Sequence, residues 1–318
     1  MRSKQLSFFF YAVQTHTKSK SSKFLDEMDK VIPWDELVAL IERHIPKNHR
    51  GRKRKDAELM LKSLCLAQWY NLSDPGLEDA INDRISFQKF LGLDLSCEQS
   101  PDETTFVKFR HFLEEHNLYE EIFKRVVEIL EEKGLIVKQG TLVDATITRA
   151  PSSTKNREKK RDPEMSSTKK GNQYYFGMKT HVGVDMKHGV VHSLTVTTAK
   201  VHDSKELENL LHGEEKYVGG DKAYCNQSLK REHRSCGITH GILDKAPRGK
   251  KLSKSQKKRN SRFSKIRSIV EFPFGIVKDL WGHKKVRYKG LYKNRCQQYF
   301  LYTLANIYRV RKLLPSTG

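Results

Sequence analysis

The run Gly-Thr-Leu-Val-Asp-Ala-Thr-Ile at residues 140–147 marks a change in the pattern of the sequence. Before it, apolar residues recur about every 3.6 residues, as in amphipathic helices. From Gly140 on they alternate with a period of two, which places Asp144 on the same strand face as Leu142 and Thr146. A carboxylate within an apolar strand is unfavourable by several kcal/mol unless it is paired. Asp144 is therefore expected to pair with a cation or bind a metal ion.

The residues before this strand predict an all-α region. The expected helices cover residues 24–45 with a break at Pro33, 56–71, 100–116 with Ser100 as N-cap, and 118–133 closed by Gly134. Phe8–Val13 is expected to be a buried strand or anchor. It is not expected to be a signal peptide, because polar and basic residues follow it without a cleavage pattern.

Strands and helices alternate after Gly140. The expected strands are 141–147, 176–185, 190–198, 216–221 and 237–243, and the expected helices are 204–211, 228–235, 266–281 and 298–314. A hairpin followed by such alternation predicts an α/β fold with a mixed sheet covered on both faces. The polar stretch 151–173 is expected to be a mobile loop. Two domains are expected, a helical one at 1–138 and a sheet-containing one at 139–318.

Composition points to a phosphate-bearing partner. The 318 residues include 60 Lys and Arg against 38 Asp and Glu, a formal net charge of +22. Nucleic acid is the commonest partner for such a surplus, although a merely cationic surface is the alternative. With a mean hydropathy of −0.69 and no apolar run near the ~18–20 residues that span a bilayer, a cytoplasmic protein with no membrane partner is expected. Five cysteines without a Cys-x-x-Cys pair fit reduced thiols.

Two further acids join Asp144 as candidates. Asp221 ends an expected strand, and sites in α/β sheets gather at strand carboxyl ends; taken alone, such an Asp is more often a cap or turn residue. Arg267, Glu271 and Lys278 are spaced by four and seven residues, which puts them within about 60° on one helix face. A surface helix with salt bridges is the alternative for these three.

The same helix is expected to pack on the sheet through a separate stripe. The stripe is apolar and consists of Ile266, Val270, Val277, Leu280 and Trp281. Pro273 predicts a kink or a restart of the helix just after Glu271.

Longer runs surround these residues and extend along nearly the whole chain. They are residues 69–74, 140–147, 150–156, 161–165, 169–173, 176–185, 210–215, 287–291 and 303–306. In these runs the chain resembles the Asp-Asp-Glu transposases of the insertion sequence 5 family. The family signature Tyr-(2)-Arg-(3)-Glu-(6)-Lys falls on Ser264, Arg267, Glu271 and Lys278, so that Ser stands in place of Tyr. The Asp-x-Gly-Tyr run is 221–224, with Ala223 for Gly.

The resemblance implies a ribonuclease H-like fold and metal-dependent DNA transposition. It implies that Asp144 bridges two Mg²⁺ ions, for which Mn²⁺ can substitute, while Asp221 binds one ion and Glu271 the other. Water first frees a 3′-hydroxyl at the element's end, and this hydroxyl then attacks target DNA. The implied partners are the terminal inverted repeats and target DNA, bound by a dimer or higher assembly in the bacterial cytoplasm, at the nucleoid.

Basic residues are expected to contact the DNA. Arg267 and Lys278 would position phosphates beside the acids. Residues 245–267 hold eleven basic residues and no acid, and are expected to form a loop that clamps the backbone, although charge runs are often merely solvated. The expected contacts there are Lys250, Lys251, Lys257, Lys258 and Arg259. Lys108 and Arg110 would contact DNA from the helical region, whose alternative role is dimerisation or packing.

Three functions fit these observations. The first is a transposase that cleaves element ends and joins them to a target. The second is a catalytically decayed transposase that acts only as a sequence-specific DNA-binding protein, which the Ser at position 264 would favour and the three retained acids oppose. The third is a ribonuclease H-fold nuclease without strand transfer.

Overall fold

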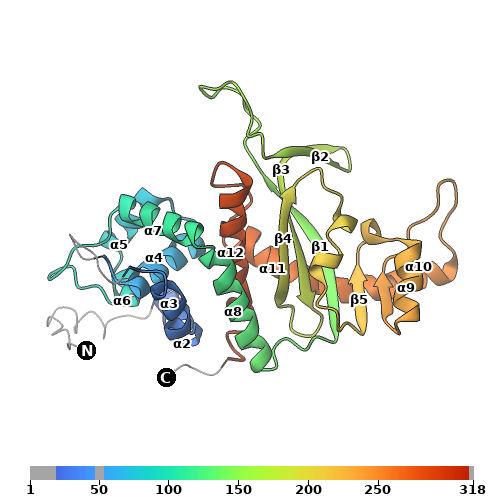
Figure 1. The fold of residues 1–318 in the computed structure, drawn as a ribbon, viewed down its shortest axis with the longest axis horizontal. Coiled ribbons are helices and arrows are strands. Elements are labelled where there is room, and N and C mark those ends of the chain that lie inside the picture. Colours follow the sequence, from blue (N-terminus) through green and yellow to red (C-terminus); the bar gives the residue numbers. More distant parts are fainter. Residues whose placement is uncertain (1–18, 47–53, 315–318) are drawn as a thin grey trace. The chain divides into compact units, whose positions relative to one another are not determined.

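The computed structural model describes residues 19–46 and 54–314, which form two compact units (Figure 1). One unit contains the residues up to Ile122 and those from Arg311 on, and the other spans Phe123–Val310. Helix α8 (Leu118–Glu132) contributes residues to both. The expectation for Phe8–Val13 falls outside the described residues. Among those described, none of the helices combines the length and the apolar character needed to cross a membrane.

The first unit is all-helical, as the sequence predicts. Its helices are α2 (Lys20–Val31), α3 (Trp34–Glu42), α4 (Ala57–Trp69), α5 (Asp74–Asp83), α6 (Ile85–Leu91) and α7 (Glu103–Glu115), with the expected break at Pro33. The expected N-cap of α7 is wrong by two residues. The carboxylate of Asp102 caps it by accepting from the backbone N–H of Thr105 at 2.7 Å, whereas the Ser100 hydroxyl donates to Asn82.

The second unit is built on a mixed sheet. Its strands are β1 (Gly140–Arg149), β2 (Ser166–Lys170), β3 (Gln173–Asp185), β4 (Val191–Thr198), β5 (Tyr217–Gly220) and β6 (Thr239–Ile242). Strand β3 runs antiparallel to β1, β2 and β4, whereas β1, β5 and β6 are parallel neighbours. An antiparallel β4–β3–β1 meander extended by two parallel strands is the ribonuclease H-like arrangement, so the predicted fold class is confirmed.

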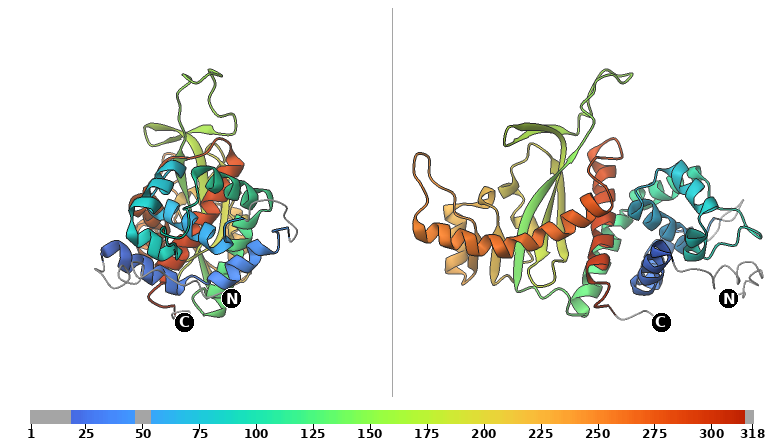
Figure 2. Two further views of the ribbon diagram at one scale, coloured as in Figure 1. Left: turned by 90° about the vertical axis from the view of Figure 1, so that its left-hand side faces the viewer. Right: turned by 180° about the vertical axis from the view of Figure 1, so that it is seen from behind.

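Helical elements cover both faces of this sheet. On the face that carries Asp144, Thr180 of β3 donates to the side chain of Gln298 on α12 (Leu291–Val310), and Asn306 of α12 bonds both backbone groups of Val191. On the opposite face, Val143 packs against Leu207, Leu210 and Tyr224. Figure 2 shows the long helical run from α10 to η5 crossing the sheet when the molecule is seen from behind.

That helical run corrects one expectation, because residues 254–267 are not a loop. Helix α10 (Lys254–Arg267) begins with a capping box in which the Ser253 hydroxyl and the Gln256 side chain each bond the other's backbone N–H. Lys and Arg are good helix formers, so a basic run with a cap is compatible with a helix. The run continues as η4 (Ser268–Val270), α11 (Glu271–Gly275) and the π-turn η5 (Ile276–Leu280). The helix restarts at Glu271, before Pro273 and not after it.

Two other expectations of secondary structure are wrong. Residues 204–211 form two short 3₁₀ turns, η1 (Asp203–Lys205) and η2 (Glu208–Leu210), in place of one helix. The stretch 151–173 is not all loop, since β2 lies within it and pairs with β3. Helix α9 (Gln227–Ser235) agrees closely with its expectation, whereas α12 begins seven residues earlier than expected.

The early start of α12 has a tertiary cause. The carboxylates of Asp162 and Glu164 accept hydrogen bonds from the backbone N–H groups of Gly290 and Leu291, each at 2.7 Å. These N–H groups lie at the N-terminus of the helix, where negative charge is favourable. The runs 161–165 and 287–291 are separate stretches of the sequence, and they contact each other in the fold. These contacts attach the long connection after β1 to the start of α12.

Candidate active site

Strand β1 positions Asp144 at the centre of the sheet. The strand pairs on both sides, with β3 and with β5, and Asp144 lies opposite Val182. Its side chain is 18% exposed. One carboxylate oxygen accepts from the backbone N–H of Ala145 at 2.8 Å, and the other accepts from Arg267 at 2.5 Å. Asp144 is thus a half-buried acid held by a cation, as its place in the strand predicts.

Asp221 follows the neighbouring parallel strand. Because Val143 pairs with Gly220, the residues that follow them, Asp144 in β1 and Asp221 just after β5, stand at adjacent positions of two neighbouring strands. Asp221 is also the N-cap of η3 (Lys222–Tyr224), where its carboxylate accepts from the N–H of Lys222 at 2.7 Å. Asp221 can therefore be both the N-cap of η3 and a residue of the candidate site.

Arg267 connects the third acid to the first. Its guanidinium contacts Asp144 through one nitrogen and lies 3.4 Å from a carboxylate oxygen of Glu271 through another. The helical spacing thus puts Arg267 and Glu271 on one helix face, as predicted, and from there Arg267 reaches Asp144 on the sheet. The apolar stripe is confirmed for Val270, Val277 and Trp281, which are buried, but Leu280 is 56% exposed. The π-turn η5 adds a residue to the last turn and rotates Leu280 away from the sheet.

The carboxylates of Glu271 and Asp221 lie near enough to Asp144 to affect its ionisation. Burial raises the pKa of Asp144 to about 6, and the nearby carboxylates of Glu271 and Asp221 also raise it. The Ala145 N–H and the Arg267 guanidinium oppose this shift. Neighbouring carboxylates that raise the pKa of Asp144 indicate a site that favours an additional cation.

The donor set suits a hard divalent cation. All three side chains offer carboxylate oxygens, which Mg²⁺ prefers, and the Arg267 guanidinium now supplies a positive charge between two of them. Over residues 19–46 and 54–314, no three His, Cys, Asp or Glu side chains are arranged closely enough to enclose a metal ion. Metal binding here would require Asp144 to exchange its ion pair with Arg267 for the metal.

Lys278 lies on the same helical run and reaches β1. Its ammonium group donates to the backbone carbonyl of Ile147. Burial, together with the positive charges of Lys170, Arg149 and Lys284, lowers the pKa of Lys278 to about 8. The spacing that predicted a shared face for Arg267 and Lys278 thus brings both side chains to β1, at Asp144 and Ile147.

The sequence did not reveal a second polar cluster beside these acids. Asp203 accepts from Lys179 of β3 at 2.8 Å and lies 3.9 Å from the ring of the fully buried His181. The turn η1 that begins with Asp203 packs against η3, which follows Asp221. His202 begins this turn by accepting from the N–H of Ser204, as expected for a helix N-terminal residue. No local pattern pairs Asp203 with Lys179, because strand β4 separates them in the sequence.

The other predicted DNA contacts fall into two groups. Lys108, Lys250, Lys251, Lys257 and Lys258 are exposed. Arg110 instead pairs through two nitrogens with Asp74, and Arg259 bonds Asp244 and the carbonyl of His240. These interactions fix the side chains of Arg110 and Arg259 within the protein.

Comparison with known proteins assigns the chain to a family. Residues 136–307, more than half of the chain, match the family described as "Transposase DDE domain". The chain belongs to the DDE transposases. Residues 13–112 match a second family, "Transposase domain (DUF772)". Among solved structures, the chain resembles the cryo-EM structure of a piggyBac transposase synaptic complex with hairpin DNA at 12% identity, with a TM-score of 0.38 and coverage of 92% of this chain and 75% of that chain.

Membership of the DDE transposase family establishes the class of reaction that the protein catalyses. DDE transposases are DNA-cleaving and strand-transferring enzymes that depend on divalent metal ions. The predicted transposase function is thereby confirmed, and a role restricted to DNA binding is not favoured. Asp144, Asp221 and Glu271 all lie within the matched residues 136–307, on β1, after β5 and on α11.

Proposed function

We propose that Asp144, Asp221 and Glu271 hold two Mg²⁺ ions with which the transposase cleaves the ends of its own insertion sequence and joins them to target DNA. The observation that carries the proposal is the Arg267 guanidinium between Asp144 and Glu271, beside Asp221. Two of the three acids already share one cation, and the third follows the adjacent strand. Mn²⁺ would substitute for Mg²⁺ with the same oxygen ligands.

Asp144 and Arg267 have different roles in the proposed reaction. When bound, a pair of divalent ions activates the attacking oxygen and stabilises the leaving oxygen. Asp144 would serve as a ligand of both ions: the Ala145 N–H orients one of its oxygens, and the other oxygen is held by Arg267 until a metal ion replaces the guanidinium. Arg267, once released from Asp144, is free to contact a phosphate of the DNA.

The exposed lysines supply the nonspecific part of DNA binding. Lys250, Lys251, Lys257 and Lys258 lie on or just before α10, which leads directly to Glu271. A row of such residues tracks a phosphate backbone and makes binding depend steeply on salt. Arg259 supports this row indirectly by anchoring α10 to Asp244.

The helical region 1–138 is proposed to recognise the terminal inverted repeats, and residues 139–318 to carry out the chemistry. The exposed Lys108 on α7 is the candidate contact in the helical region, and Arg110 holds α7 to α5 through Asp74. Because two element ends must be joined to one target, the working assembly is a dimer or larger, bound to DNA in the bacterial cytoplasm.

The decisive experiment uses DNA that flanks the gene. Imperfect inverted repeats outside the reading frame supply the substrate, and cleavage is followed with Mg²⁺, with Mn²⁺ and with EDTA. Nicking at the repeat end, followed by joining of pre-cut ends to a plasmid, is the expected result. Cleavage without joining would instead identify a nuclease, and metal-independent binding alone would identify a decayed transposase.

Arg267→Gln is expected to make the folded chain depend on metal. The substitution leaves Asp144 and Glu271 without their shared cation, and breaking a partly buried ion pair costs roughly 1–3 kcal/mol. The melting temperature in EDTA at pH 8 should fall, and Mg²⁺ should raise it more in the variant than in the wild type. Lys284→Gln is the matched control, because Lys284 pairs with an exposed acid, Asp279, at 2.9 Å. Equal Mg²⁺ shifts in all three proteins would contradict the proposed exchange.

DNA affinity is expected to decrease as the pH rises from about 7 to 9. The pKa of Lys278 is lowered to about 8, so this side chain loses its positive charge within that window, whereas ordinary lysines titrate near 10.4. Fluorescence anisotropy in EDTA measures the change. Lys278→Arg keeps its charge throughout and should flatten the dependence. The same slope in Lys278→Arg would show that another group is responsible.

A further inference from the structure

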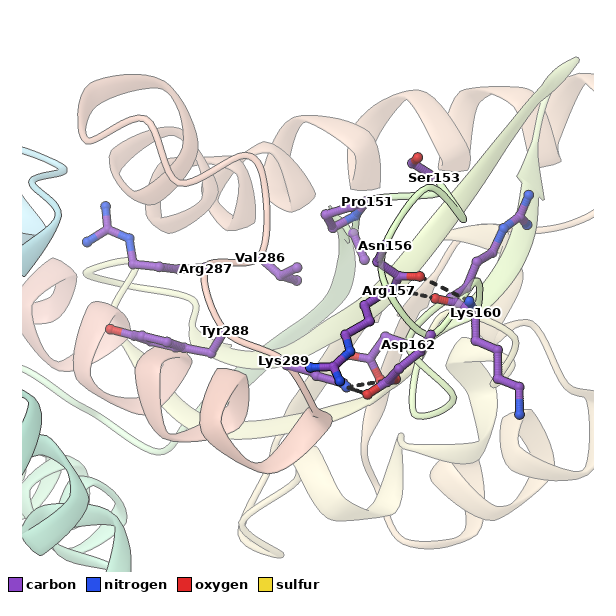
Figure 3. A pocket seen from close by; sticks show the side chains of 13 residues that line it. Pro151, Ser153, Asn156, Arg157, Lys160, Asp162, Val286, Arg287, Tyr288 and Lys289 are labelled. Carbon is purple, nitrogen blue, oxygen red and sulfur yellow. Dashed lines mark hydrogen bonds and ion pairs between the residues drawn. The ribbon is translucent and has the colours of Figure 1, made fainter.

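Two cavities meet beyond the end of β1. One, of about 560 Å³, lies between residues 150–162 and the segment 286–289 (Figure 3). The other, of about 470 Å³, is lined by Arg149, the loop after it and the hairpin β2–β3. Ala150 and Arg161 line both cavities, so the two lie next to each other. We call the pair the hairpin groove, defined by residues 149–162, 173–176 and 286–289.

The hairpin groove is strongly basic. Its basic lining residues are Arg149, Arg157, Lys160, Arg161, Arg287 and Lys289. Its two acids are already engaged: Glu158 lies 3.2 Å from the ammonium of Lys289, and Asp162 accepts from the N–H of Gly290. Figure 3 shows the first of these contacts, with the side chains of both chain segments around the cavity. The remaining charge is suited to phosphates.

Aromatic rings stand among these charges. Tyr174 is 77% exposed, and the ammonium of Lys169 lies 5.4 Å from the centre of its ring. The Arg149 guanidinium lies 4.9 Å from the ring of Tyr175, and that of Arg161 lies 5.4 Å from the ring of Phe176. Such a mixture of cations and accessible rings offers both phosphate contacts and stacking surfaces, the combination that binds single-stranded nucleic acid.

The shape of the groove selects unpaired nucleotides over duplex. Bases in a duplex are stacked on each other, and their faces are hidden from a protein ring. A cavity of a few hundred cubic ångströms accommodates a ligand of small-molecule size. Splayed nucleotides fit such a space, whereas a duplex offers only its outer surface.

The groove begins close to the catalytic acids. Arg149 follows Asp144 by five residues along β1, which is roughly 17 Å of extended strand. Lys278, bonded to Ile147 between these two positions, lies near enough to Arg149 and Lys170 for both charges to affect it. Lys278 thus lies between Asp144 and the basic residues Arg149 and Lys170 at the hairpin end of β1.

We propose that the hairpin groove binds unpaired nucleotides of the DNA end next to the cleavage site. Tyr174 and Tyr175 stack on the bases, and Arg149, Arg157 and Lys160 hold the phosphates between them. This inference rests on the proposed function, because it takes a DNA end as the ligand. The inference assigns recognition of an opened DNA end to the β2–β3 hairpin. The exposed lysines on and just before α10 do not provide this recognition.

The test compares two DNA probes on the full chain in EDTA. One is a blunt duplex, and the other is the same duplex extended by a short run of unpaired thymidines containing one 2-aminopurine. The extended probe should bind about tenfold more tightly, the gain expected from stacking one or two bases. Its 2-aminopurine fluorescence should be quenched on binding.

Variants of the two tyrosines make the test specific. The double variant Tyr174→Ala, Tyr175→Ala should lose the tenfold preference and the quenching, yet bind the blunt duplex as before. The matched control Tyr174→Phe, Tyr175→Phe keeps both rings and should retain both effects. Because the probe comparison and the quenching are measured on the wild type, the test does not depend on the folding of a variant.

The outcomes separate this inference from the proposed function. If the wild-type protein cleaves element ends with Mg²⁺ but binds both probes equally, only the proposal for the hairpin groove is overturned. Alanine variants that weaken both probes to the same degree also overturn it, since they indicate a general backbone contact. Wild-type protein that binds neither probe overturns both proposals.

Discussion

Asp144→Asn should abolish DNA cleavage, with a loss of at least a thousandfold, equivalent to about 4 kcal/mol of transition-state stabilisation. The amide is nearly isosteric but carries no negative charge, so it cannot serve as the central metal ligand between Asp221 and Glu271. Asp221→Asn and Glu271→Gln should have effects of the same order. Combining any two of these changes should add little, because the three acids act as one unit. Nicking of an end substrate with Mg²⁺ is the measurement.

Folding and DNA binding should survive this substitution. The pKa of Asp144 is raised to about 6, so the folded chain binds a proton there more tightly than the unfolded chain does. Its contribution to stability is thus most favourable at low pH and is lost as the pH rises through about 6. The uncharged amide of the Asp144→Asn variant has no such dependence, so the melting temperature of the variant at neutral pH should be equal to or higher than that of the wild type.

A control on the same helical run isolates the role of the site. Asp279→Asn removes a carboxylate of η5 whose side chain is 71% exposed, and cleavage should be unaffected. Substantial Mg²⁺-dependent cleavage by Asp144→Asn would disprove the assignment of this residue as a ligand.

Gly183→Ala should destabilise the second unit by about 3 kcal/mol, the upper end of the range for overpacked positions. A Cβ at this position would lie 2.3 Å from the backbone oxygen of Leu210, and a backbone atom cannot move aside as a side-chain end can. Gly183 is also the residue of β3 that pairs with Val143, directly before Asp144. Chemical denaturation gives the change in unfolding free energy, and cleavage should fall with it.

Gly275→Ala provides the comparison for this effect. Nothing lies within 4 Å of a Cβ at Gly275, which is the last residue of α11, and alanine is the better helix former. Its stability should be unchanged or slightly increased. Equal effects of the two substitutions would mean that the close approach of η2 to β3 is not what requires a glycine at position 183.

The local pattern of the sequence is sufficient for most of the framework. Strand β1 was predictable because one apolar alternation contains it, and α2 and α3 because Pro33 separates two helical patterns. The mixed sheet followed from a hairpin that precedes alternating strands and helices. All three acids could be chosen because they stand at strand centre, strand end and helix face, and the resemblance in the surrounding runs agreed.

Strand β2 was missed because its sequence, Ser-Ser-Thr-Lys-Lys, contains no apolar residue, although only residues 171 and 172 separate it from β3. The start of α12 depends instead on contacts between distant residues. Helix α12 begins at Leu291 because Asp162 and Glu164, more than a hundred residues earlier, cap it. Neither acid lies within a sequence window of the helix.

The same reason explains the partners of the arginines. A charged residue in a basic protein suggests DNA, yet Arg110 holds Asp74 and Arg259 holds Asp244. Nor does the sequence show that Arg267 links two of the predicted acids, because helical spacing gives a direction and no distance to β1.

The capping of α12 by the connection after β1 has a consequence for damaged copies of the gene. A premature stop codon between positions 272 and 290 would delete the helix, and with it the N–H groups that hold Asp162 and Glu164 and the Asn306 side chain that bonds Val191. In the truncated product one face of the sheet would no longer be covered by α12. The segment that contains Asp162 and Glu164 would also lose its hydrogen bonds to the start of that helix. Such alleles should yield insoluble protein, even though every codon of Asp144, Asp221 and Glu271 remains intact.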